Sequence, residues 1–165
     1  MKMIQPSLIE QKGIKMRVVL QRVKEARVIV KGNTIGEISK GYLLFVGVEN
    51  QDSEEDIDWL TKKITNMRLF SDENGKMNLS IQEVEGEILS ISQFTLFAST
   101  KKGNRPSFIK SAKAEFAKKM YDLFNGSLKT NMNKEVQKGV FGADMQVELV
   151  NDGPVTILLD SKNKE

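Results

Sequence analysis

The sequence of 165 residues contains no cysteine and no histidine. The absence of cysteine excludes a disulfide framework, a thiolate nucleophile and the usual kind of structural zinc site, which fits a reducing cytoplasm. The absence of histidine removes the commonest general base, so Ser-His-Asp and Cys-His catalysis are excluded. Any hydrolysis would therefore need another base, a metal ion held by carboxylates, or help from the substrate itself.

Long hydrophobic runs are also missing. The longest apolar stretch, Tyr42–Val48, is far shorter than the roughly 20 residues that a membrane-spanning helix needs. Residues 1–15 lack both a continuous apolar core and a small-residue cleavage site, so a secretory signal is not indicated. We expect residues 1–15 to be a disordered extension or a cloning remnant, residues 16–160 to form one domain, and residues 161–165 to be a polar tail. The resulting expectation is a cytoplasmic protein with no membrane partner.

The composition, with 39% apolar and 28% charged residues, is typical of a globular domain with one hydrophobic core. A net charge of +3 favours an anionic partner only mildly. The distribution of charge is more informative, because seven basic residues fall close together: Lys101, Lys102, Arg105, Lys110, Lys113, Lys118 and Lys119. Two interpretations remain open, a surface for a phosphate backbone and an ordinary solvated loop and helix face.

Segments rich in valine and isoleucine predict most of the strands. Around the short polar link Lys24-Glu25, Met16–Val23 and Ala26–Lys31 predict an antiparallel hairpin. A second pair of strands is predicted at Thr34–Ser39 and Tyr42–Val48. Further strands are predicted at Glu87–Phe94, Val140–Val150 and Pro154–Leu159. The last two flank Asn151-Asp152-Gly153-Pro154, which has the composition of a hairpin turn.

Two segments have helical periodicity instead. After the cap residues Asp52 and Ser53, an acidic first turn leads into apolar residues at helical spacing: Ile57, Leu60, Ile64 and Met67. A second helix is predicted over residues 112–128, with an apolar stripe formed by Phe116, Met120, Leu123 and Phe124. These elements predict an α+β fold, in which two main helices pack against a curved, mainly antiparallel, barrel-like sheet.

The segment Ser92–Leu96 ends a hydrophobic strand with several hydrogen-bonding groups. Polar residues at the end of a strand often line a site. They also satisfy nearby backbone groups in ordinary strand ends, so this segment alone leaves both interpretations open. Asn151–Thr156 is likewise a strong turn signal without being a functional one.

Six short motifs occur in order along the chain, and in combination they resemble the D-aminoacyl-tRNA deacylase family. The motifs are MRVVLQRV from Met16, GKMNL from Gly75, SQFTL from Ser92, RPSF from Arg105, ADMQV from Ala143 and NDGPVT from Asn151. The resemblance runs from Met16 to about Leu159. Each motif is weak alone, but six in order are highly specific.

The resemblance implies a homodimer whose two active sites lie at the subunit interface. In this family the pair that matches Gly153-Pro154 has a cis peptide bond and enters the partner subunit's site. Carbonyl oxygens there accept the ammonium group of the bound amino acid, and main chain blocks the direction of an L side chain. D side chains point outward, and glycine, which has no side chain, is not excluded. The implied substrates are D-aminoacyl-tRNA and glycyl-tRNA.

The resemblance also implies how the reaction proceeds. Ser92, Gln93, Phe94 and Thr95 would surround the scissile ester and the 3′-terminal adenosine, with backbone N–H groups near Phe94 and Thr95 available to the developing oxyanion. No evident base would make Thr95 a nucleophile. We therefore expect hydrolysis in which the ribose 2′-hydroxyl helps to activate water, without a metal ion or a cofactor.

Three more residues are implied in substrate binding. Arg22 matches an arginine that orients the Gly-Pro pair, with an ion pair on the strand face as the alternative. Phe141 and Met145 match positions that contact the terminal nucleotide, although Met145 suits a core role as well. Two rival functions also stay open: a non-catalytic tRNA-binding protein, and an amidohydrolase that depends on Thr95.

Overall fold

The computed structural model describes residues 16–165, and the expected extension over residues 1–15 lies outside them. The chain forms two α-helices, α1 (Glu54–Asn66) and α2 (Ala114–Met132), and a short 3₁₀ helix, η1 (Phe94–Phe97). The strands are β1 (Arg17–Val30), β2 (Asn33–Ile38), β3 (Gly41–Gly47), β4 (Phe70–Ser71), β5 (Met77–Leu79), β6 (Glu87–Ser92), β7 (Gln137–Lys138) and β8 (Gln146–Asp160). Within the described part of the chain, no helix is long and apolar enough to span a membrane.

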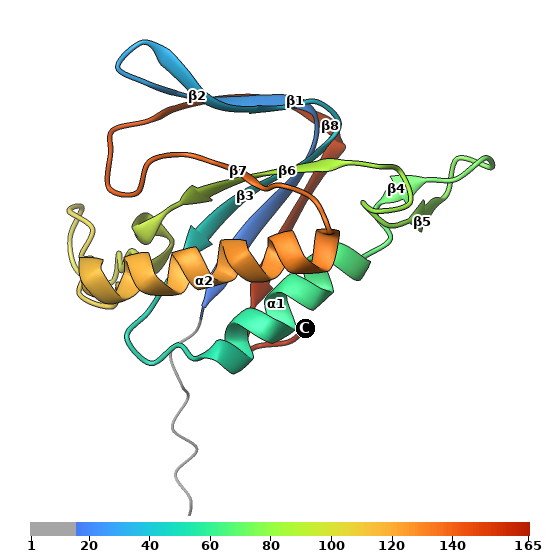
Figure 1. The fold of residues 1–165 in the computed structure, drawn as a ribbon. Helices are drawn as coiled ribbons and strands as arrows, with labels where there is room; N and C mark the ends of the chain where they lie inside the picture. Colours follow the sequence, from blue (N-terminus) through green and yellow to red (C-terminus); the bar gives the residue numbers. More distant parts are fainter. Residues whose placement is uncertain (1–15) are drawn as a thin grey trace, which may run out of the picture.

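The large sheet contains both antiparallel and parallel pairs. Its strands lie in the order β2-β1-β3-β6-β7, and β8 pairs along β1 as well. β1 is antiparallel to β2, β3 and β8, whereas β3 and β6, and β6 and β7, are parallel. Parallel pairs need crossover connections, and α1 and α2 lie in the two crossovers. Both helices cover one face of the sheet (Figure 1), which confirms the predicted α+β class with a curved, mainly antiparallel, barrel-like sheet.

The predicted hairpin at Lys24-Glu25 is wrong, because β1 runs through both residues as one strand. The register of β1 against β8 shifts on either side of Val23, so the strand bulges here instead of turning. A two-residue hairpin turn needs positions that accept a positive φ, which Lys24-Glu25 does not offer. The chain reverses instead at Lys31 and Gly32, whose φ values are +48° and +79°.

The strands β2 and β3 form as predicted, but each pairs with β1 and not with the other. β3 pairs with residues 17–23 of β1, and β2 pairs with residues 26–30. Since both are antiparallel to β1, they follow one another along it in the same direction. The outer half of β1 and β2 thus form a flap that folds over the sheet on the side away from the helices, as Figure 1 shows.

The second predicted hairpin, at Asn151–Pro154, is also wrong. The two predicted closing strands are collinear parts of β8, which pairs with β1 along nearly its whole length. Gln21 faces Thr156 and Val23 faces Asn151, so residues 152–155 form a bulge opposite the single residue Arg22. The strand begins at Gln146 and not at Val140, because the chain is still in a turn before that point.

Two hydrophobic clusters hold the layers together. The larger cluster lies between the sheet and the helices and includes Tyr42, Leu44 and Phe124. The smaller cluster lies within the curved sheet and includes Leu43 and Leu89. Successive side chains of a strand point to opposite faces. Neighbouring residues of β3 therefore supply different clusters, which explains why β3 is a continuous apolar run and does not alternate.

Both predicted helices are confirmed. Ser53 is the N-cap of α1, and its backbone N–H donates to the Asp56 carboxylate over 2.8 Å, so the acidic run serves the helix terminus. α2 starts two residues later than predicted and continues to Met132. Met120 and Phe124 are buried as expected, but Leu123 is 40% exposed, because the buried stripe passes through Tyr121 instead.

The approach of β3 to β6 leaves no room for a side chain at Gly41. A Cβ atom at this position would lie 1.8 Å from the Glu87 carbonyl oxygen, whereas a Cβ at Gly126 in α2 would meet nothing within 4 Å. We expect Gly41→Ala to lower the free energy of unfolding by about 3 kcal/mol or more, since backbone has to move. Gly126→Ala, the matched control, should raise it by about 0.5–1 kcal/mol. Urea unfolding measures both, and an unchanged Gly41→Ala would refute this packing.

Candidate active site

A cavity of about 420 Å³ lies where β3 and β6 end beside the first turns of α2. Two walls are formed by segments that are far apart in sequence, Ser92–Phe94 and Phe141–Met145. The structure therefore brings together five of the predicted site residues: Ser92, Gln93, Phe94, Phe141 and Met145. The third wall, which sequence reasoning missed, consists mainly of small residues from α2 and the segment before it: Ser111, Ala112, Ala114 and Ala117.

The segment Ser92–Phe97 changes conformation at the cavity. β6 ends at Ser92, and Phe94, which the sequence assigned to the strand, begins η1. The Gln93 N–H donates to the Val46 carbonyl over 2.8 Å and so fixes the turn to β3. Within residues 16–165 the N–H groups of Phe94 and Thr95 donate no hydrogen bond. Two adjacent backbone donors are thus available to a ligand at the edge of the cavity.

The Thr95 side chain is exposed and does not line the cavity. Its hydroxyl accepts a hydrogen bond from the Gln93 side-chain amide over 2.5 Å, its sole side-chain contact of this kind with the described residues. An amide does not accept a proton from a hydroxyl at neutral pH. This arrangement orients Thr95 but does not activate it as a nucleophile.

Ser111 holds Phe94 in place from the opposite wall. Its hydroxyl donates to the Phe94 carbonyl over 2.9 Å, and the Phe94 ring stacks edge-on against Phe108 with 5.1 Å between centroids. The Phe94 ring is nevertheless 58% exposed. A flat apolar surface therefore stands at the mouth of the cavity.

The Phe141 and Met145 wall lies over both hydrophobic clusters. Phe141 packs against the larger cluster, and its ring lies 5.9 Å from that of Tyr121. Met145 packs against the smaller cluster, so the core role and the cavity role are compatible. Burial raises the pKa of Tyr121, whose hydroxyl donates to the Ser90 carbonyl over 2.8 Å. Tyr121 is therefore a neutral structural donor and not a base.

Asp144 is the only acidic residue that lines this cavity within the described residues, and sequence reasoning did not select it. Its side chain is exposed and forms no hydrogen bond or ion pair with the described residues. Its position was hidden because it belongs to a turn whose distance from Ser92 depends on the fold. Among residues 16–165 no group of three acidic side chains is arranged to hold a metal ion.

Gly153 and Pro154 lie away from this cavity. Their bulge sits opposite Arg22, which pairs with Tyr42 of β3, whereas Ser92 pairs with Val46. Four residues of strand separate the two levels, which corresponds to about 13 Å. The two motifs that carry the sequence resemblance are therefore not brought together within one chain.

The bulge has a defined internal structure. The buried Arg22 side chain donates to the carbonyl oxygens of Asp152, over 2.9 Å, and Leu69. The Asn151 side chain accepts a hydrogen bond from the Val155 N–H over 2.8 Å. The Gly153-Pro154 peptide bond is cis, and both residues are exposed. Arg22 forms no ion pair with the described residues, so it holds main chain instead of an acidic partner.

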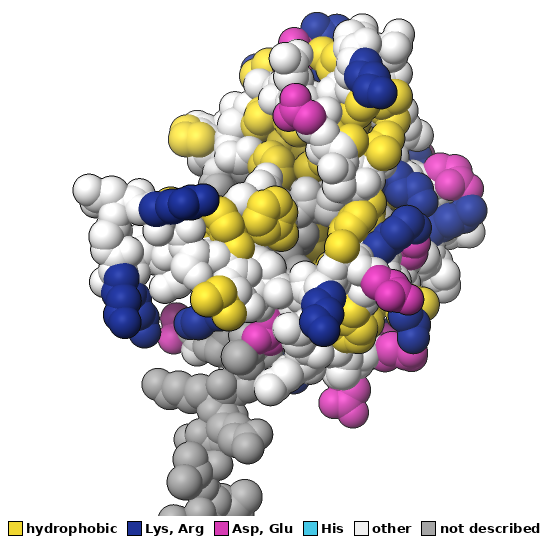
Figure 2. All heavy atoms as spheres, turned by 90° about the vertical axis from the view of Figure 1, so that its left-hand side faces the viewer, with side chains coloured by type: hydrophobic (Ala, Val, Ile, Leu, Met, Phe, Trp, Pro, Cys, Tyr) yellow, Lys and Arg dark blue, Asp and Glu magenta, His cyan; other side chains and the backbone are white. Residues whose placement is uncertain are grey.

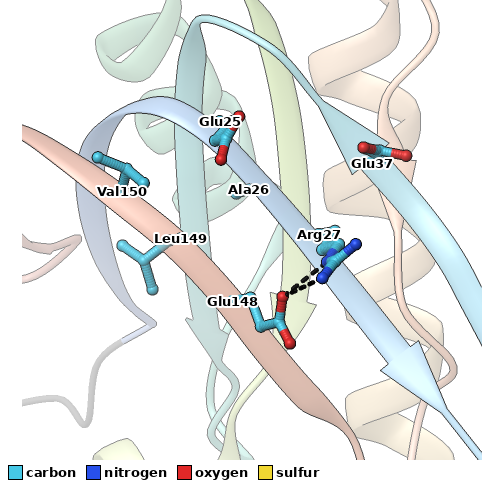
Figure 3. Close-up of a pocket in the computed structure, with 7 residues that line it drawn as sticks. All are labelled: Glu25, Ala26, Arg27, Glu37, Glu148, Leu149 and Val150. Carbon is cyan, nitrogen blue, oxygen red and sulfur yellow. Dashed lines mark hydrogen bonds and ion pairs between the residues drawn. The ribbon is translucent and has the colours of Figure 1, made fainter. Parts of the chain in front are cut away.

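A second hollow lies on the outer surface of β1, β2 and β8 and is shown in Figure 3. Arg27 and Glu148 form an ion pair across it over 2.6 Å, with Glu25 and Glu37 nearby. Hydrogen bonding to Glu148 raises the pKa of Arg27. Both partners are about half exposed, and such surface pairs contribute little stability. None of the predicted site residues lies here.

The chain matches known proteins over nearly its full length. The family model described as D-Tyr-tRNA(Tyr) deacylase matches residues 19–160. A D-aminoacyl-tRNA deacylase from Flavobacterium johnsoniae is 59% identical over 150 residues, which cover 91% of this chain and all of that protein. A protein of the same name from Bacteroides fragilis is 61% identical with the same coverage.

Solved structures also resemble this chain. A protein described as c-Myc DNA Unwinding Element Binding Protein superposes with a TM-score of 0.82 at 39% identity, over 87% of this chain and 97% of that one. A probable eukaryotic D-amino acid tRNA deacylase has a TM-score of 0.78 over 88% and 99%, and at 16% identity it supports the fold alone. From the family match and the identities above, the chain belongs to the D-aminoacyl-tRNA deacylase family, whose members are hydrolases that act on the ester bond of aminoacyl-tRNA.

Proposed function

We propose that this chain hydrolyses the ester bond of D-aminoacyl-tRNA and of glycyl-tRNA in the cytoplasm, releasing the amino acid and the tRNA. One observation carries the proposal. Two adjacent backbone N–H groups have no partner among the described residues: that of Phe94, which lines a cavity with apolar walls, and that of Thr95, the next residue along the chain. A cavity of about 420 Å³ has the size of an ordinary small-molecule site.

The terminal adenosine of the tRNA would occupy this cavity. Phe141 and Met145 offer it an aromatic ring and a polarisable thioether, while the small residues on the α2 side leave room for a base and a ribose. The ester on the ribose would then lie at the Ser92–Thr95 edge. Phe141 and Met145 pack against the two hydrophobic clusters, so they would position the reacting bond before the reaction begins.

Charge develops on the ester carbonyl oxygen as water adds. The free N–H groups at Phe94 and Thr95 would stabilise this oxyanion, and a single donor of this kind is typically worth about 10² to 10³ in rate. The Ser111 and Gln93 hydrogen bonds would act only by holding the segment in place. The chemistry proposed here therefore depends on main chain and not on a reactive side chain.

A water molecule still needs a proton acceptor or a positioning group. The Gln93 amide beside Thr95 and the neutral Tyr121 hydroxyl supply no base. We assign this role to the ribose 2′-hydroxyl of the tRNA, which lies next to the ester in any pose. An ester is a labile bond, so positioning and oxyanion stabilisation can suffice with this help.

Selection of the D form would depend on a second copy of the chain. Gly153 and Pro154 are exposed, and about 13 Å of strand separates their level from that of Ser92 in the same chain. A symmetric homodimer would place this bulge over the partner's cavity. Its carbonyl oxygens would bind the ammonium group, and its main chain would occupy the space of an L side chain. Arg22 would hold the bulge in register. Glycyl-tRNA would not be excluded, because glycine has no side chain.

Matched D- and L-tyrosyl-tRNA separate this function from its rivals. We expect the D ester to be hydrolysed faster by about 100-fold or more, because a steric clash costs roughly 3 kcal/mol and each 1.4 kcal/mol is a factor of ten. Glycyl-tRNA should be hydrolysed as well. Release of tyrosine from neither ester would refute the proposal and favour a protein that only binds tRNA.

A further inference from the structure

The charge of this chain is concentrated next to the cavity. Residues 99–119, called the basic segment below, contain seven lysine or arginine residues and one acidic residue, Glu115, a local charge of +6. The whole chain has a net charge of +3, so the remainder carries −3. An even distribution of charge does not produce this contrast, which indicates a surface built for an anion.

The positive side chains of the basic segment are available to a ligand. All seven are exposed. The Lys118 side chain pairs with Asp122 over 2.8 Å, and none of the other six basic side chains forms an ion pair or a hydrogen bond with a described residue. These six side chains therefore remain available to a ligand.

The basic segment is also a wall of the cavity. Ser111, Ala112, Ala114 and Ala117 line the cavity, and the exposed residues Lys110 and Lys113 alternate with them along the chain. The segment is anchored behind the cavity by backbone hydrogen bonds, since Ala112 N–H donates to the Val48 carbonyl over 3.0 Å. Figure 2 looks onto this side of the molecule and shows basic side chains around a group of hydrophobic ones.

Apolar side chains accompany the charges. Phe108 is 36% exposed, and Ile109 is 89% exposed. Phe108 packs edge-on against Phe94 at the mouth of the cavity, with 5.1 Å between ring centroids. Exposed aromatic groups among cations are typical of surfaces that bind single-stranded nucleic acid, because bases stack on the rings while phosphates meet the cations.

We propose that the basic segment binds the unpaired 3′ end of the tRNA and the adjoining phosphates of its acceptor stem. The inference rests on the proposed function, which places the terminal adenosine in the cavity. The nucleotides before that adenosine must leave through the cavity mouth, where Phe94 and Phe108 offer ring faces. Lys101, Lys102 and Arg105 then lie in the exposed loop that continues from this mouth. A surface for an acidic protein partner would need the positive charges but would not need the exposed rings of Phe94 and Phe108.

The test compares two triple variants on two substrates. In the loop variant, Lys101, Lys102 and Arg105 are each replaced by Gln. In the control variant, three exposed lysines elsewhere on the chain are replaced by Gln: Lys62, Lys76 and Lys129. Both lose three positive charges. The substrates are D-tyrosyl-tRNA and D-tyrosyl-adenosine, which carries the same ester but no phosphates.

For the loop variant we expect KM for D-tyrosyl-tRNA to rise roughly tenfold to a hundredfold with kcat unchanged, and hydrolysis of D-tyrosyl-adenosine to remain at the wild-type rate. The dependence of log(kcat/KM) on log salt should become less steep by about 2, since each phosphate contact in a single strand contributes about 0.7. The control variant should keep the wild-type KM and salt dependence.

Three results would overturn the inference alone: an equal loss in both variants, an equal loss on both substrates, or no loss in the loop variant. The first would indicate a general charge effect, the second a distorted cavity, and the third a different role for the segment. Wild-type chain that hydrolyses neither substrate would instead refute the proposed function, so the two failures are distinguishable.

Discussion

A heterodimer assembled from two inactive variants of this chain is expected to recover about half of the wild-type rate of D-tyrosyl-tRNA hydrolysis. One variant is Ala143→Trp, which fills the cavity from its edge. The other is Gly153→Ala, which disturbs the bulge. Each should be inactive as a homodimer, because each damages both copies of its element.

The two substitutions act by separate physical effects. Ala143 lies in a turn, so an added indole can enter the cavity without disturbing the main core. Gly153 has a φ of +141°, and an added Cβ would lie 2.8 Å from Val155 Cγ2 and 3.1 Å from the Arg22 guanidinium. An L residue rarely adopts this φ, so the bulge must shift. A displacement of about 1 Å at a site of this kind can cost roughly 100-fold in rate.

The recovery follows from how the intact parts are distributed. In the heterodimer, the Gly153→Ala subunit has an intact cavity and receives the intact bulge of its partner. The other site combines two damaged parts. One of two sites therefore works if the bulge acts across the interface. If it acts within its own chain, no intact site exists and the heterodimer is as inactive as its parents.

A second heterodimer makes the experiment decisive. Wild-type chain paired with the double variant Ala143→Trp/Gly153→Ala should be nearly inactive. The wild-type cavity receives the damaged bulge of its partner, and the partner's own cavity is filled. Action within one chain predicts half of the wild-type rate for this pair instead. Two affinity tags allow each heterodimer to be purified, and failure to recover any mixed dimer would refute the dimer itself.

A tRNA that ends in 2′-deoxyadenosine is expected to be deacylated slower by about 10² to 10⁴, the usual contribution of a positioned proton acceptor. The reason is that the described side chains around the Ser92–Thr95 edge include no activated base. The D-aminoacyl group must be attached to the 3′-hydroxyl in both substrates. Single-turnover rates with enzyme in excess would report the chemical step and not product release.

Two variants test the remaining side chains on the normal substrate. Thr95→Ala should keep activity within several-fold of the wild type, because the Thr95 hydroxyl meets only the Gln93 amide. Asp144→Asn should do the same, because Asp144 is exposed at the rim and its loss leaves both backbone donors intact. If either variant loses its activity and the deoxy substrate is hydrolysed at the normal rate, that side chain and not the 2′-hydroxyl assists the reaction.

Local patterns predicted the elements that depend on neighbouring residues. The helix around Ile57 and Leu60 was predicted from apolar spacing and a capping residue, which act within one or two turns. The alternation of Val147 and Leu149 with Glu148 likewise predicted a strand with one buried side. The order of the six short motifs along the chain was enough to indicate the family, because comparing motifs requires no knowledge of which residues are in contact.

The wrong predictions concern segments whose structure depends on the distant strand with which they pair. Lys24-Glu25 is a short polar link and Asp152–Pro154 has the composition of a turn, yet both lie in long strands, at or beside a shift in register. β1 and β8 run side by side for more than ten residues, and their ladder of hydrogen bonds outweighs local turn preferences at both places. No pattern within a few residues reports such a distant partner.

The sequence by itself determined the absence of thiol and imidazole chemistry, the capped start of the first helix and the family. Only the tertiary structure decided that Phe94 and Phe141 share a cavity, that Asp144 and Ser111 border it, and that Gly153 lies far from it. The physical reason is distance along the chain. Composition and periodicity reflect forces between near neighbours, whereas a site is formed by whichever strand ends the sheet brings together.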